Sequence, residues 1–472
     1  MQWARTMKMT KALLRCATLL LVMLVLASGI TGCGSVKTEQ REVHVAVDGS
    51  DKTGKGTQDE PFASISAAAK AAPGSVIIVH KGEYGAVQLD PSCSGSEAAQ
   101  TIIRPKEGEN VVIHAEDGVG ISLVNVSHVL VEGLEVEGGT HGIYYESTRE
   151  ASQPLTDIRI KDCTVHGVRG THGICVYARN DLAPIQDIAL EGCEVYDCEC
   201  GNSESLVLNG NIDGFVIKGN TIHDNNNIGI DMIGFEGTAK HPRGGGFENE
   251  FESDMVRNGI CSENVVYNIS TEGNQAYFEE GEYDPSADGI YVDGGQNIEI
   301  YNNFIFNCDI GIEVASEHSP EDNELFRVSG IRVHDNVVAD CTGWTGMCFG
   351  GYDKDLGFTE ECEFEHNTLV DNTAQIGVQR SRDNHVKANL IVGGETAIEF
   401  NDYCNEEDMV NDISGNAFCE IEDEESWAAE YGAMYEDRSA LLDGFHSLID
   451  GVGSSFVPNE KQMELYLAHK TE

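Results

Sequence analysis

The 472-residue sequence predicts an all-β fold, a single-stranded right-handed parallel β-helix of about ten coils. Three observations predict it. Short apolar segments repeat along the chain, most of them carry Asn at one fixed place, and a second short strand follows each one. In residues 288–318 the phrases "DGIYVDGG" and "IGIEVASEH" repeat after about 22 residues, a spacing typical of the coils of a solenoid.

Ten segments align, from VEGLEV (131–136) to ISGNAF (413–418). Their fourth residues are Leu134, Cys163, Cys193, Asn220, Asn264, Asn303, Asn336, Asn367, Asn389 and Asn416. Asn suits a tight turn because it tolerates the left-handed conformation, and its amide can bond to the coils above and below. Cys is a small apolar replacement of similar volume. We therefore expect an internal Asn ladder, with two short strands in each coil.

The amino-terminal part carries a family resemblance. Residues 43–84 contain a Gly-Ser-Asp, a Gly-Thr and a Pro-Phe, followed by an Ala-rich stretch. This pattern resembles the entry motif of the pectate lyase and alginate lyase-like β-helix proteins. The resemblance covers most of residues 43–420, and it implies that residues 64–72 form a small helix capping the first coil. It leaves the chemistry open, because β-helices host lyases, hydrolases, epimerases and non-enzymes.

The ends of the chain predict export and closure of the stack. Basic residues precede an apolar run in residues 1–32, which is typical of a signal peptide, and "GITGC" resembles the lipobox of bacterial lipoproteins. Cys33 is therefore the expected lipidation site and residues 33–42 a tether, which implies an exported protein held on the extracytoplasmic face of the membrane. The alternative is an uncleaved anchor helix. Residues 421–472 have helical spacing and are the expected partly helical C-terminal cap.

Composition excludes some partners. The formal net charge is −50, so we expect repulsion of nucleic acid, and contact with the membrane only through the lipid at Cys33. The thirteen cysteines that follow Cys33 are an odd number, which disfavours a complete disulfide framework. We expect a monomer.

Acidic residues fall on one outward row of the second strands. Because side chains alternate across a strand, Asp231 in "GIDMI" is expected to face outward between inward Ile230 and Met232. The same phase gives an outward row of Cys175, Asp231, Tyr291, Glu313, Cys348, Gln379 and Glu399. Its neighbour row is Tyr177, Ile233, Asp293, Ala315, Gly350, Ser381 and Asn401.

Asp231, Asp293 and Glu313 are the predicted catalytic residues. Coils stack about 4.8 Å apart, so Asp293 and Glu313 are expected roughly 5–7 Å apart, and Asp231 and Glu313 about 10 Å apart. These separations straddle the two geometries of glycosidases. Carboxylates this close also raise one another's pKa or share Ca²⁺, which makes Asp231 and Asp293 candidate calcium ligands and calcium a candidate cofactor. The alternative is a solvated acidic face.

Tyr291, Tyr277 and Glu399 are the predicted substrate-binding residues. Irregular segments leave after these strands or arrive before them, and they carry aromatic residues such as Tyr277 in residues 271–287. Loops that spring from one edge build the walls of a cleft, and aromatic rings beside acids suit sugars. The alternative is that these rings pack the loops.

Three functions stay open from the sequence. The chain can be a surface enzyme that cleaves a polysaccharide, by hydrolysis or by calcium-assisted β-elimination. It can be a non-catalytic glycan-binding or adhesive protein, or a structural spacer. Acids, aromatics and insertions on one edge disfavour the spacer.

Overall fold

The structure is a computed structural model that describes residues 40–240, 252–279, 281–319 and 324–470. The expected signal peptide, Cys33 and all but the end of the tether lie outside the described residues. Among the helices that the structure describes, none combines the length and the apolar character needed to cross a membrane. Residues 41–472 form one compact unit, which contains the whole β-fold.

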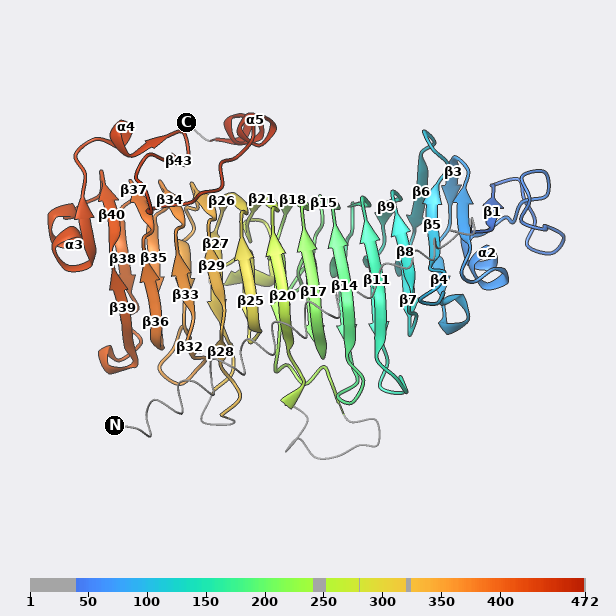
Figure 1. Ribbon diagram of the computed structural model, residues 1–472, viewed down its shortest axis with the longest axis horizontal. Coiled ribbons are helices and arrows are strands. Elements are labelled where there is room, and N and C mark those ends of the chain that lie inside the picture. The colour runs from blue at the N-terminus through green and yellow to red at the C-terminus, as the bar shows by residue number, and fades with distance from the viewer. Residues whose placement is uncertain (1–39, 241–251, 280, 320–323, 471–472) are drawn as a thin grey trace, which may run out of the picture. The chain divides into compact units, whose positions relative to one another are not determined.

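Three long parallel sheets wind along this unit as a right-handed β-helix, so each coil has three strands (Figure 1). We call them sheets A, B and C. The expectation of two strands per coil was wrong, because the aligned six-residue segments each bend once. IKGNTI, for example, ends strand β17 (Ile212–Lys218) of sheet A and begins strand β18 (Thr221–Asn225) of sheet B. Alternating hydrophobicity does not reveal a corner of one or two residues.

Sheet A contains β1 (Glu42–Val45), β2 (Val76–Val79), β5 (Thr101–Pro105), β8 (Val129–Glu132), β11 (Leu155–Lys161), β14 (Ile185–Glu191), β17, β20 (Val256–Ser262), β25 (Gln296–Tyr301), β28 (Val328–Ser329), β29 (Arg332–His334), β32 (Thr359–Glu360), β33 (Glu363–Glu365), β36 (Ser381–Lys387) and β39 (Met409–Ser414). Sheet B contains β3 (Gly82–Tyr84), β6 (Val111–Ala115), β9 (Glu135–Gly138), β12 (Thr164–His166), β15 (Glu194–Tyr196), β18, β21 (Val265–Ile269), β26 (Phe304–Cys308), β30 (Val337–Ala339), β34 (Thr368–Val370), β37 (Leu390–Val392), β40 (Asn416–Cys419) and β41 (Gly432–Met434). Sheet C contains β4 (Val87–Leu89), β7 (Val119–Val124), β10 (His141–Ser147), β13 (His172–Ala178), β16 (Leu206–Gly210), β19 (Ile230–Ile233), β24 (Asp288–Asp293), β27 (Ile310–Ala315), β31 (Thr345–Phe349), β35 (Ala374–Val378) and β38 (Thr396–Phe400). Two hairpins lie outside these sheets: β22 (Phe278–Glu279) pairs with β23 (Glu282–Tyr283), and β42 (Leu442–Asp443) pairs with β43 (His446–Ser447). Short 3₁₀ turns cover Pro91–Cys93, Gln275–Tyr277 and Glu406–Asp408.

The Asn ladder is present at the corner between sheets A and B. The Asn303 side-chain oxygen accepts the backbone N–H of Asn264 at 3.0 Å and its amide at 2.9 Å. Asn336 repeats both contacts with Asn303, at 3.0 and 2.9 Å. The ladder residues are fully buried, so each amide satisfies a backbone group that water cannot reach. The left-handed residue is the one before the ladder position, such as Asn302 with φ of 56°, and not the ladder Asn itself.

The amino-terminal end is closed as expected. Helix α2 (Ile65–Ala71) begins at Ser64, whose hydroxyl accepts the N–H of Ala67 at 3.2 Å. Its buried face, Ile65, Ala68 and Ala69, joins the main core.

The carboxy-terminal segment does two things. Helix α3 (Glu424–Tyr431) lies at the end of the stack, where Trp427 and Tyr431 pack on the main core (Figure 1). After helix α4 (Arg438–Leu441) the chain turns back, and helix α5 (Glu460–His469) lies along the outer face of sheet B. That outer face carries buried Phe304 and Phe306, so it needs an apolar cover that an ordinary solvated face does not.

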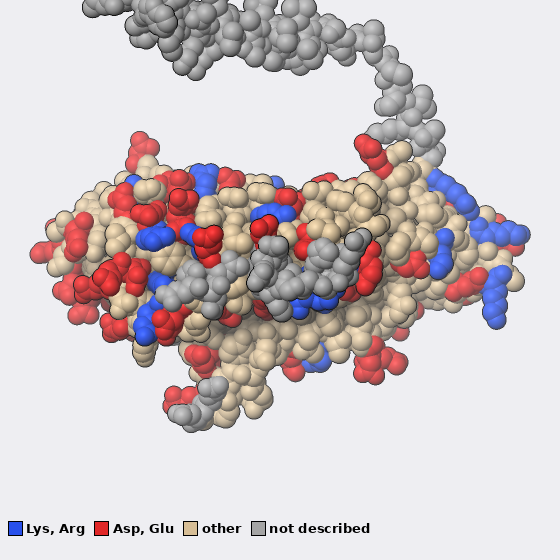
Figure 2. Space-filling view, turned by 90° about the horizontal axis from the view of Figure 1, so that it is seen from below, with Lys and Arg blue, Asp and Glu red and all other residues tan. Residues whose placement is uncertain are grey.

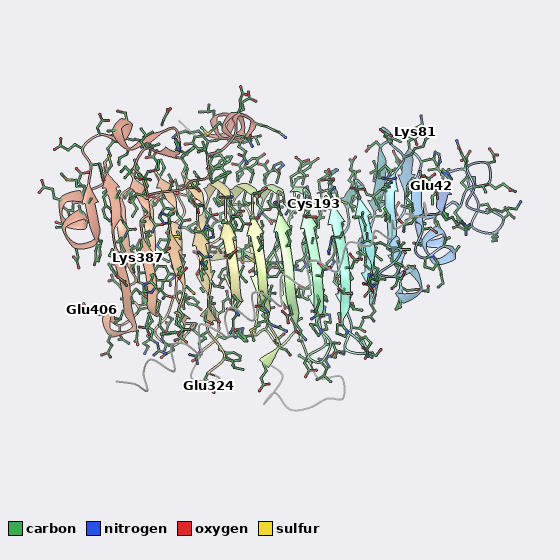
Figure 3. All side chains as sticks on the ribbon, viewed as in Figure 1. Glu42, Lys81, Cys193, Glu324, Lys387 and Glu406 are labelled. Atoms are coloured by element: carbon green, nitrogen blue, oxygen red, sulfur yellow. The ribbon has the colours of Figure 1, made fainter. Side chains whose placement is uncertain are left out.

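Charged side chains lie on the outside of the β-helix. Figure 2 shows more acidic than basic side chains over the visible face, in keeping with the net charge of −50. In Figure 3 the labelled Glu406 and Glu324 project from the edge, whereas the buried thiol of Cys193 lies at the ladder position. All thirteen cysteines of the described residues are free thiols, twelve of them buried.

Candidate active site on sheet C

The predicted acidic row lies on the outer face of sheet C. Asp231 on β19 pairs with Tyr291 on β24, and Tyr291 pairs with Glu313 on β27. Asp293 lies two residues beyond Tyr291 on the same face. The structure therefore brings the three predicted catalytic residues together on three consecutive strands.

The two rows need one correction farther along. Cys348 pairs with Gly377, and Gly377 pairs with Glu399, so Gly377 and not Gln379 continues the row. Gln379 lies two residues later, in the neighbour row, and Ser381 belongs to β36 in sheet A. The prediction failed here because a phase counted along the sequence shifts wherever a connection gains or loses one residue.

A fourth acid that the alternation rule placed inside belongs to the cluster. Asp288 has the phase of Ile290 and Val292, which point into the core, yet its carboxyl is hydrogen-bonded to that of Glu313. The alternation breaks at Gly289. A Cβ on this glycine would lie 2.8 Å from the carbonyl oxygen of Gly311, so only glycine allows the strands to approach this closely here. We call Asp231, Asp288, Asp293 and Glu313 the acidic cluster.

Three of the four acids in the acidic cluster are buried, Glu313 is partly exposed, and the cluster is incompletely paired. Asp231 and Asp288 are each 2% exposed and Asp293 is 4% exposed. One carboxyl oxygen of Asp231 and one of Asp288 have no hydrogen-bond partner among the described residues. Asp293 is better held, because its Oδ1 accepts the backbone N–H of Glu317 at 3.1 Å. Buried oxygens without a partner are costly, which makes this a site for a ligand or for protons.

Burial is the main reason why these acids hold protons. It raises the pKa of Asp231, Asp288 and Asp293 well above the usual range, and neighbouring carboxylates raise them further. For Glu313 burial raises the pKa to about 7, with the charge of Glu317 adding to the shift and the Asp288 hydrogen bond opposing it. Near neutral pH the cluster therefore holds shared protons.

Further acids and a tyrosine surround the cluster. Glu204 and Glu236 both raise the pKa of Asp231, after burial, which places their charges beside it. Glu236 is held by the Asn209 amide at 2.7 Å. The predicted substrate-binding Tyr277 also lies here: its hydroxyl accepts from the Asn227 amide at 3.1 Å, and burial and then the charge of Glu204 raise its pKa.

The other two predicted substrate-binding residues have different settings. Tyr291 is 6% exposed, so it packs between the acids and offers little surface. Glu399 is exposed, three strands beyond Glu313 in the same row, and accepts the Trp344 indole N–H at 3.2 Å. The structure thus separates Glu399 from the acidic cluster by about 14 Å along the stack, at about 4.8 Å per strand.

The loop aromatics fall into two groups. Phe235 and Phe358 are buried and pack the bases of their loops. Phe278 is 43% exposed and Tyr352 54% exposed, so these rings are available to a ligand.

The side chains best placed to hold a metal ion lie outside the acidic cluster. In the part of the chain that the structure describes, one group of three ligand atoms lies within 4.8 Å of one another, and it consists of His141, His172 and Cys175. It occupies the same face of sheet C, on β10 and β13. Asp231 and Asp293, the candidate calcium ligands, do not belong to such a group.

Sequence reasoning missed Asp288, Glu204 and the histidines. The signal was present: "HGIYY", "HGICV" and "DGIYV" each place a polar residue directly before glycine. Strict alternation hid it, because the glycine irregularity turns the preceding side chain to the outer face.

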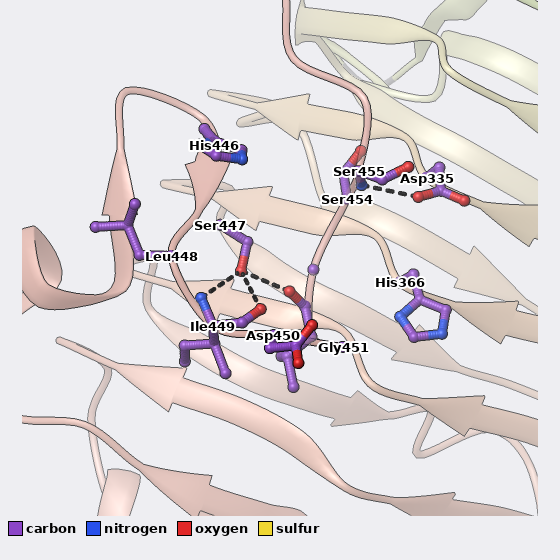
Figure 4. Close-up of a pocket in the computed structure, with 12 residues that line it drawn as sticks. Asp335, His366, His446, Ser447, Leu448, Ile449, Asp450, Gly451, Ser454 and Ser455 are labelled. Atoms are coloured by element: carbon purple, nitrogen blue, oxygen red, sulfur yellow. Dashed lines mark hydrogen bonds between the residues drawn. The ribbon is translucent and has the colours of Figure 1, made fainter.

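A pocket elsewhere lacks this chemistry. It has a volume of about 600 Å³ and lies in the C-terminal segment, between residues 446–455 and the edge of sheet B (Figure 4). Ser447 Oγ is bonded to the backbone of Ile449 and Val452, and Asp335 accepts the N–H of Ser455 at 2.8 Å. These groups hold the segment in place, and the acids of sheet C are not among the lining residues.

Comparison with known proteins identifies the family. A family model described as "Periplasmic copper-binding protein (NosD)" matches residues 80–234 and 247–428. The chain belongs to the NosD family. This NosD-family chain is also 33% identical over 440 residues to "Uncharacterized protein YwoF" of Bacillus subtilis (strain 168), covering 86% of this chain and 87% of the relative.

The chain is similar to several solved structures. The lacto-N-biosidase of family GH136 from Eubacterium ramulus has a TM-score of 0.55 and 12% sequence identity. The match covers 80% of the NosD-family chain and 67% of the lacto-N-biosidase chain. The Azotobacter vinelandii mannuronan C-5 epimerase AlgE6 A-module has a TM-score of 0.47 and 14% sequence identity. The match covers 79% of the NosD-family chain and 95% of the epimerase module. Pectate lyase Pel9A has a TM-score of 0.43 and 12% sequence identity, and the match covers 90% of the NosD-family chain and 93% of the lyase chain. The parallel β-helix fold that the resemblance of residues 43–84 implied is confirmed by the three parallel sheets of the chain itself.

Proposed function

We propose that this NosD-family chain is an extracytoplasmic glycoside hydrolase that acts on a polysaccharide with the acidic cluster of sheet C. One observation carries the proposal: four carboxyls with raised pKa gather on three consecutive strands, three of them buried and Glu313 partly exposed, and two of them share a hydrogen bond. Glycoside hydrolysis needs this combination of one protonated and one ionised carboxyl on either side of a sugar linkage.

Glu313 is the proposed general acid. A pKa of about 7 matches a proton donor that works near neutral pH, because the donor is protonated before the reaction and gives up its proton readily. Its proton would go to the oxygen of the leaving sugar. Asp288 holds Glu313 through the hydrogen bond between their carboxyls and supplies the next proton.

Asp293 is the proposed general base. Burial raises the pKa of Asp293, and the backbone N–H of Glu317 opposes that shift by stabilising the ionised form that a base needs. Asp293 lies one strand and two residues from Glu313, so their Cα atoms are about 8 Å apart. Side chains on one face of a sheet stand roughly parallel, so the carboxyls are about this far apart, which is wider than the expected 5–7 Å. That separation leaves room for a water between them and favours inversion of the anomeric centre.

Hydrolysis is favoured over β-elimination by the local charges. Elimination next to a uronate needs a base and a cation that neutralises the sugar carboxylate. The charges that raise the pKa of the cluster residues all belong to carboxylates. A neutral or amino sugar chain therefore suits this surface better than a polyuronate, which it would repel.

Calcium remains a second way to neutralise the cluster. Asp231 and Asp293 offer oxygen ligands of the kind that Ca²⁺ takes, and buried unpaired oxygens are available for it. A rise of the melting temperature with Ca²⁺ that Asp231→Asn removes would support calcium binding there.

The test is product analysis on a panel of neutral and uronate polysaccharides. New reducing ends with no unsaturated product, lost in Glu313→Gln and retained in the surface variant Glu299→Gln, support hydrolysis. Unsaturated ends would indicate a lyase. Binding of a glycan, measured by affinity electrophoresis, without formation of any product would indicate a non-catalytic glycan-binding protein.

A further inference from the structure

One buried arginine lies near the far end of sheet C without a partner. Arg380 comes two residues after strand β35 and is 9% exposed. Its Nε and Nη1 are buried and have no hydrogen-bond partner among the described residues. A guanidinium keeps its charge in proteins, so it cannot relieve the cost of burial by losing a proton, whereas a buried carboxylate can relieve that cost by gaining one. The proposed hydrolysis does not use Arg380.

The partly buried arginines of the described chain differ from Arg380, because each of them is paired with a carboxylate. They are Arg159, Arg179, Arg257, Arg327 and Arg438. The chain has 80 acidic residues against 30 Lys and Arg, so carboxylates are abundant. A buried guanidinium that still lacks one indicates that its counterion is a ligand and not a part of the fold.

The carboxylate on the adjacent strand is already occupied. Arg380 lies over the ring of Phe358, with its guanidinium carbon 5.6 Å from the ring centre, and Arg382 lies over the same ring at 4.8 Å. Glu360 follows Phe358 by two residues, and it pairs through Oε1 with Arg327 and through Oε2 with Arg382. Both of its oxygens are therefore used. The positive charge of Arg380 remains, within a chain whose net charge is −50.

Arg380 lies at the base of two loops that carry exposed tyrosines. Its backbone N–H donates to the Gly351 carbonyl at 3.1 Å, and its carbonyl accepts the Gly351 N–H at 3.2 Å, where the loop of residues 351–358 begins. Asn401 begins the second loop, and its amide donates to the Tyr352 carbonyl at 3.0 Å. Tyr352 is 54% exposed and Tyr403 is 79% exposed. The loops that border Arg380 thus offer rings of the kind that contact sugars.

Arg380 is within reach of a glycan that lies over the acidic cluster. Strand β35 is two strands beyond β27, so Arg380 lies about 10 Å from Glu313 along the stack, at about 4.8 Å per strand. The loop of Tyr352 bridges this interval. Burial and then the charge of Glu317 raise the pKa of Tyr352, and Glu317 also adds to burial in raising the pKa of Glu313. One bound chain can therefore contact both places.

We propose that Arg380 binds an oxyanion, a carboxylate or a sulfate ester, that an occasional sugar of the glycan carries. The identity of the carrier rests on the proposed hydrolysis, whereas the anion site itself does not. A guanidinium offers planar N–H donors that match such oxyanions. A chain charged on every sugar is repelled by the acidic cluster, so the ligand is a mostly neutral glycan with sparse acidic substituents. Arg380 then determines which linkage of that glycan lies over Glu313.

The experiment measures binding of small anions to the full chain by equilibrium dialysis at low ionic strength. The probes are glucuronate, glucose 6-sulfate and inorganic sulfate, with glucose as the neutral reference. We expect one saturable site per chain for a sugar anion, none for glucose, and binding at least tenfold weaker in Arg380→Gln. Arg380→Lys keeps the charge and loses the planar donors, so its affinity should lie between these two. Arg380→Gln removes an unpaired buried charge, so it should melt no lower than wild type, and the sugar anion should raise the melting temperature of wild type alone.

Arg382→Gln is the matched control. Arg382 lies over the same Phe358 ring, but it is paired with Glu360 and its side chain is 54% exposed. Its loss should change the affinity for the sugar anion by less than about threefold. Equal loss of binding in the two variants, unchanged binding in Arg380→Gln, or no saturable binding by folded wild type would overturn the site. Inorganic sulfate that binds as tightly as glucose 6-sulfate would overturn the glycan as the carrier. The dialysis contains no polysaccharide, so a failure of the proposed hydrolysis does not decide the anion site.

Discussion

The carboxyl of Asp288 is hydrogen-bonded to the carboxyl of Glu313, which lies on the next strand of sheet C. Two carboxyl groups form such a bond only when at least one of them is protonated. Because Asp231 and Asp293 flank the pair, full ionisation would bring four negative charges together, three of them on buried side chains. The protein is therefore built to hold protons here at pH values where ordinary carboxyls have lost them.

The first prediction concerns stability against pH. The pKa of Glu313 is about 7 in the folded protein, against an ordinary value of 4.5. Between these values the folded state binds more protons than the unfolded state, so the free energy of unfolding falls as pH rises. We expect a loss of about 1–3 kcal/mol between pH 5 and pH 8, measured by urea denaturation.

Glu313→Gln should flatten this dependence, since glutamine does not titrate. Glu299→Gln is the control, because Glu299 forms a half-exposed ion pair with Arg332 on sheet A. A wild-type protein that is as stable at pH 8 as at pH 5 would contradict the proton-sharing cluster.

The second prediction separates the roles of Asp293. Asp293→Asn keeps the shape of the side chain and removes the proposed base. Hydrolysis should fall by a factor of about 10² or more, as expected for loss of a general base. If Asp293 instead serves calcium, the variant should lose only a calcium-dependent rise in melting temperature. A variant that matches wild type in both assays would exclude Asp293 from the site.

Most of the fold could be predicted from the sequence. The ladder position is marked directly, because buried corners that use an amide in seven successive coils leave Asn at one phase from Asn220 to Asn416. The number of strands per coil could not be predicted. The corner occupied by the ladder interrupts each apolar segment for only one or two residues, which periodicity does not resolve.

The site was predictable in part. Alternation placed Asp231, Asp293 and Glu313 correctly on one face, because β19, β24 and β27 are regular beyond their first residue. Applied to Asp288 and His172, which precede Gly289 and Gly173, the same rule would put both side chains on the inner face. The close approach of neighbouring backbones at these glycines is a tertiary constraint, and a single sequence shows only that glycine is present.

The third prediction concerns export. Cys33→Ala should abolish lipidation and release the processed protein from membranes, because the thiol is the attachment point of the lipid. Metabolic labelling with a fatty acid and fractionation of cells would measure this. Continued membrane retention of an unlabelled Cys33→Ala protein would indicate an uncleaved anchor helix.

The fourth prediction concerns helix α5. Tyr466 is 5% exposed and packs edge-on against Phe306, with ring centroids 5.4 Å apart. Tyr466→Ala should lower the stability of the C-terminal segment by about 3–5 kcal/mol and expose the outer face of sheet B. We expect faster amide exchange in residues 457–470 and new binding of a hydrophobic dye. Unchanged exchange there would show that α5 does not depend on this contact.

The last prediction tests the ladder itself. Asn303 accepts from Asn264 and donates its amide to the Cys261 carbonyl at 3.0 Å, so Asn303→Ala leaves buried backbone groups on two neighbouring coils without partners. Stability should fall by about 1–3 kcal/mol for each such group, moderated where water enters the vacated space. Asn110→Ala is the control, because Asn110 is exposed and its amide bonds only to Glu135, at 3.1 Å. It should change the free energy of unfolding by less than about 0.5 kcal/mol. Equal stability of Asn303→Ala and Asn110→Ala in urea denaturation would mean that the buried amides are not what joins the coils, and that core packing alone holds the stack together.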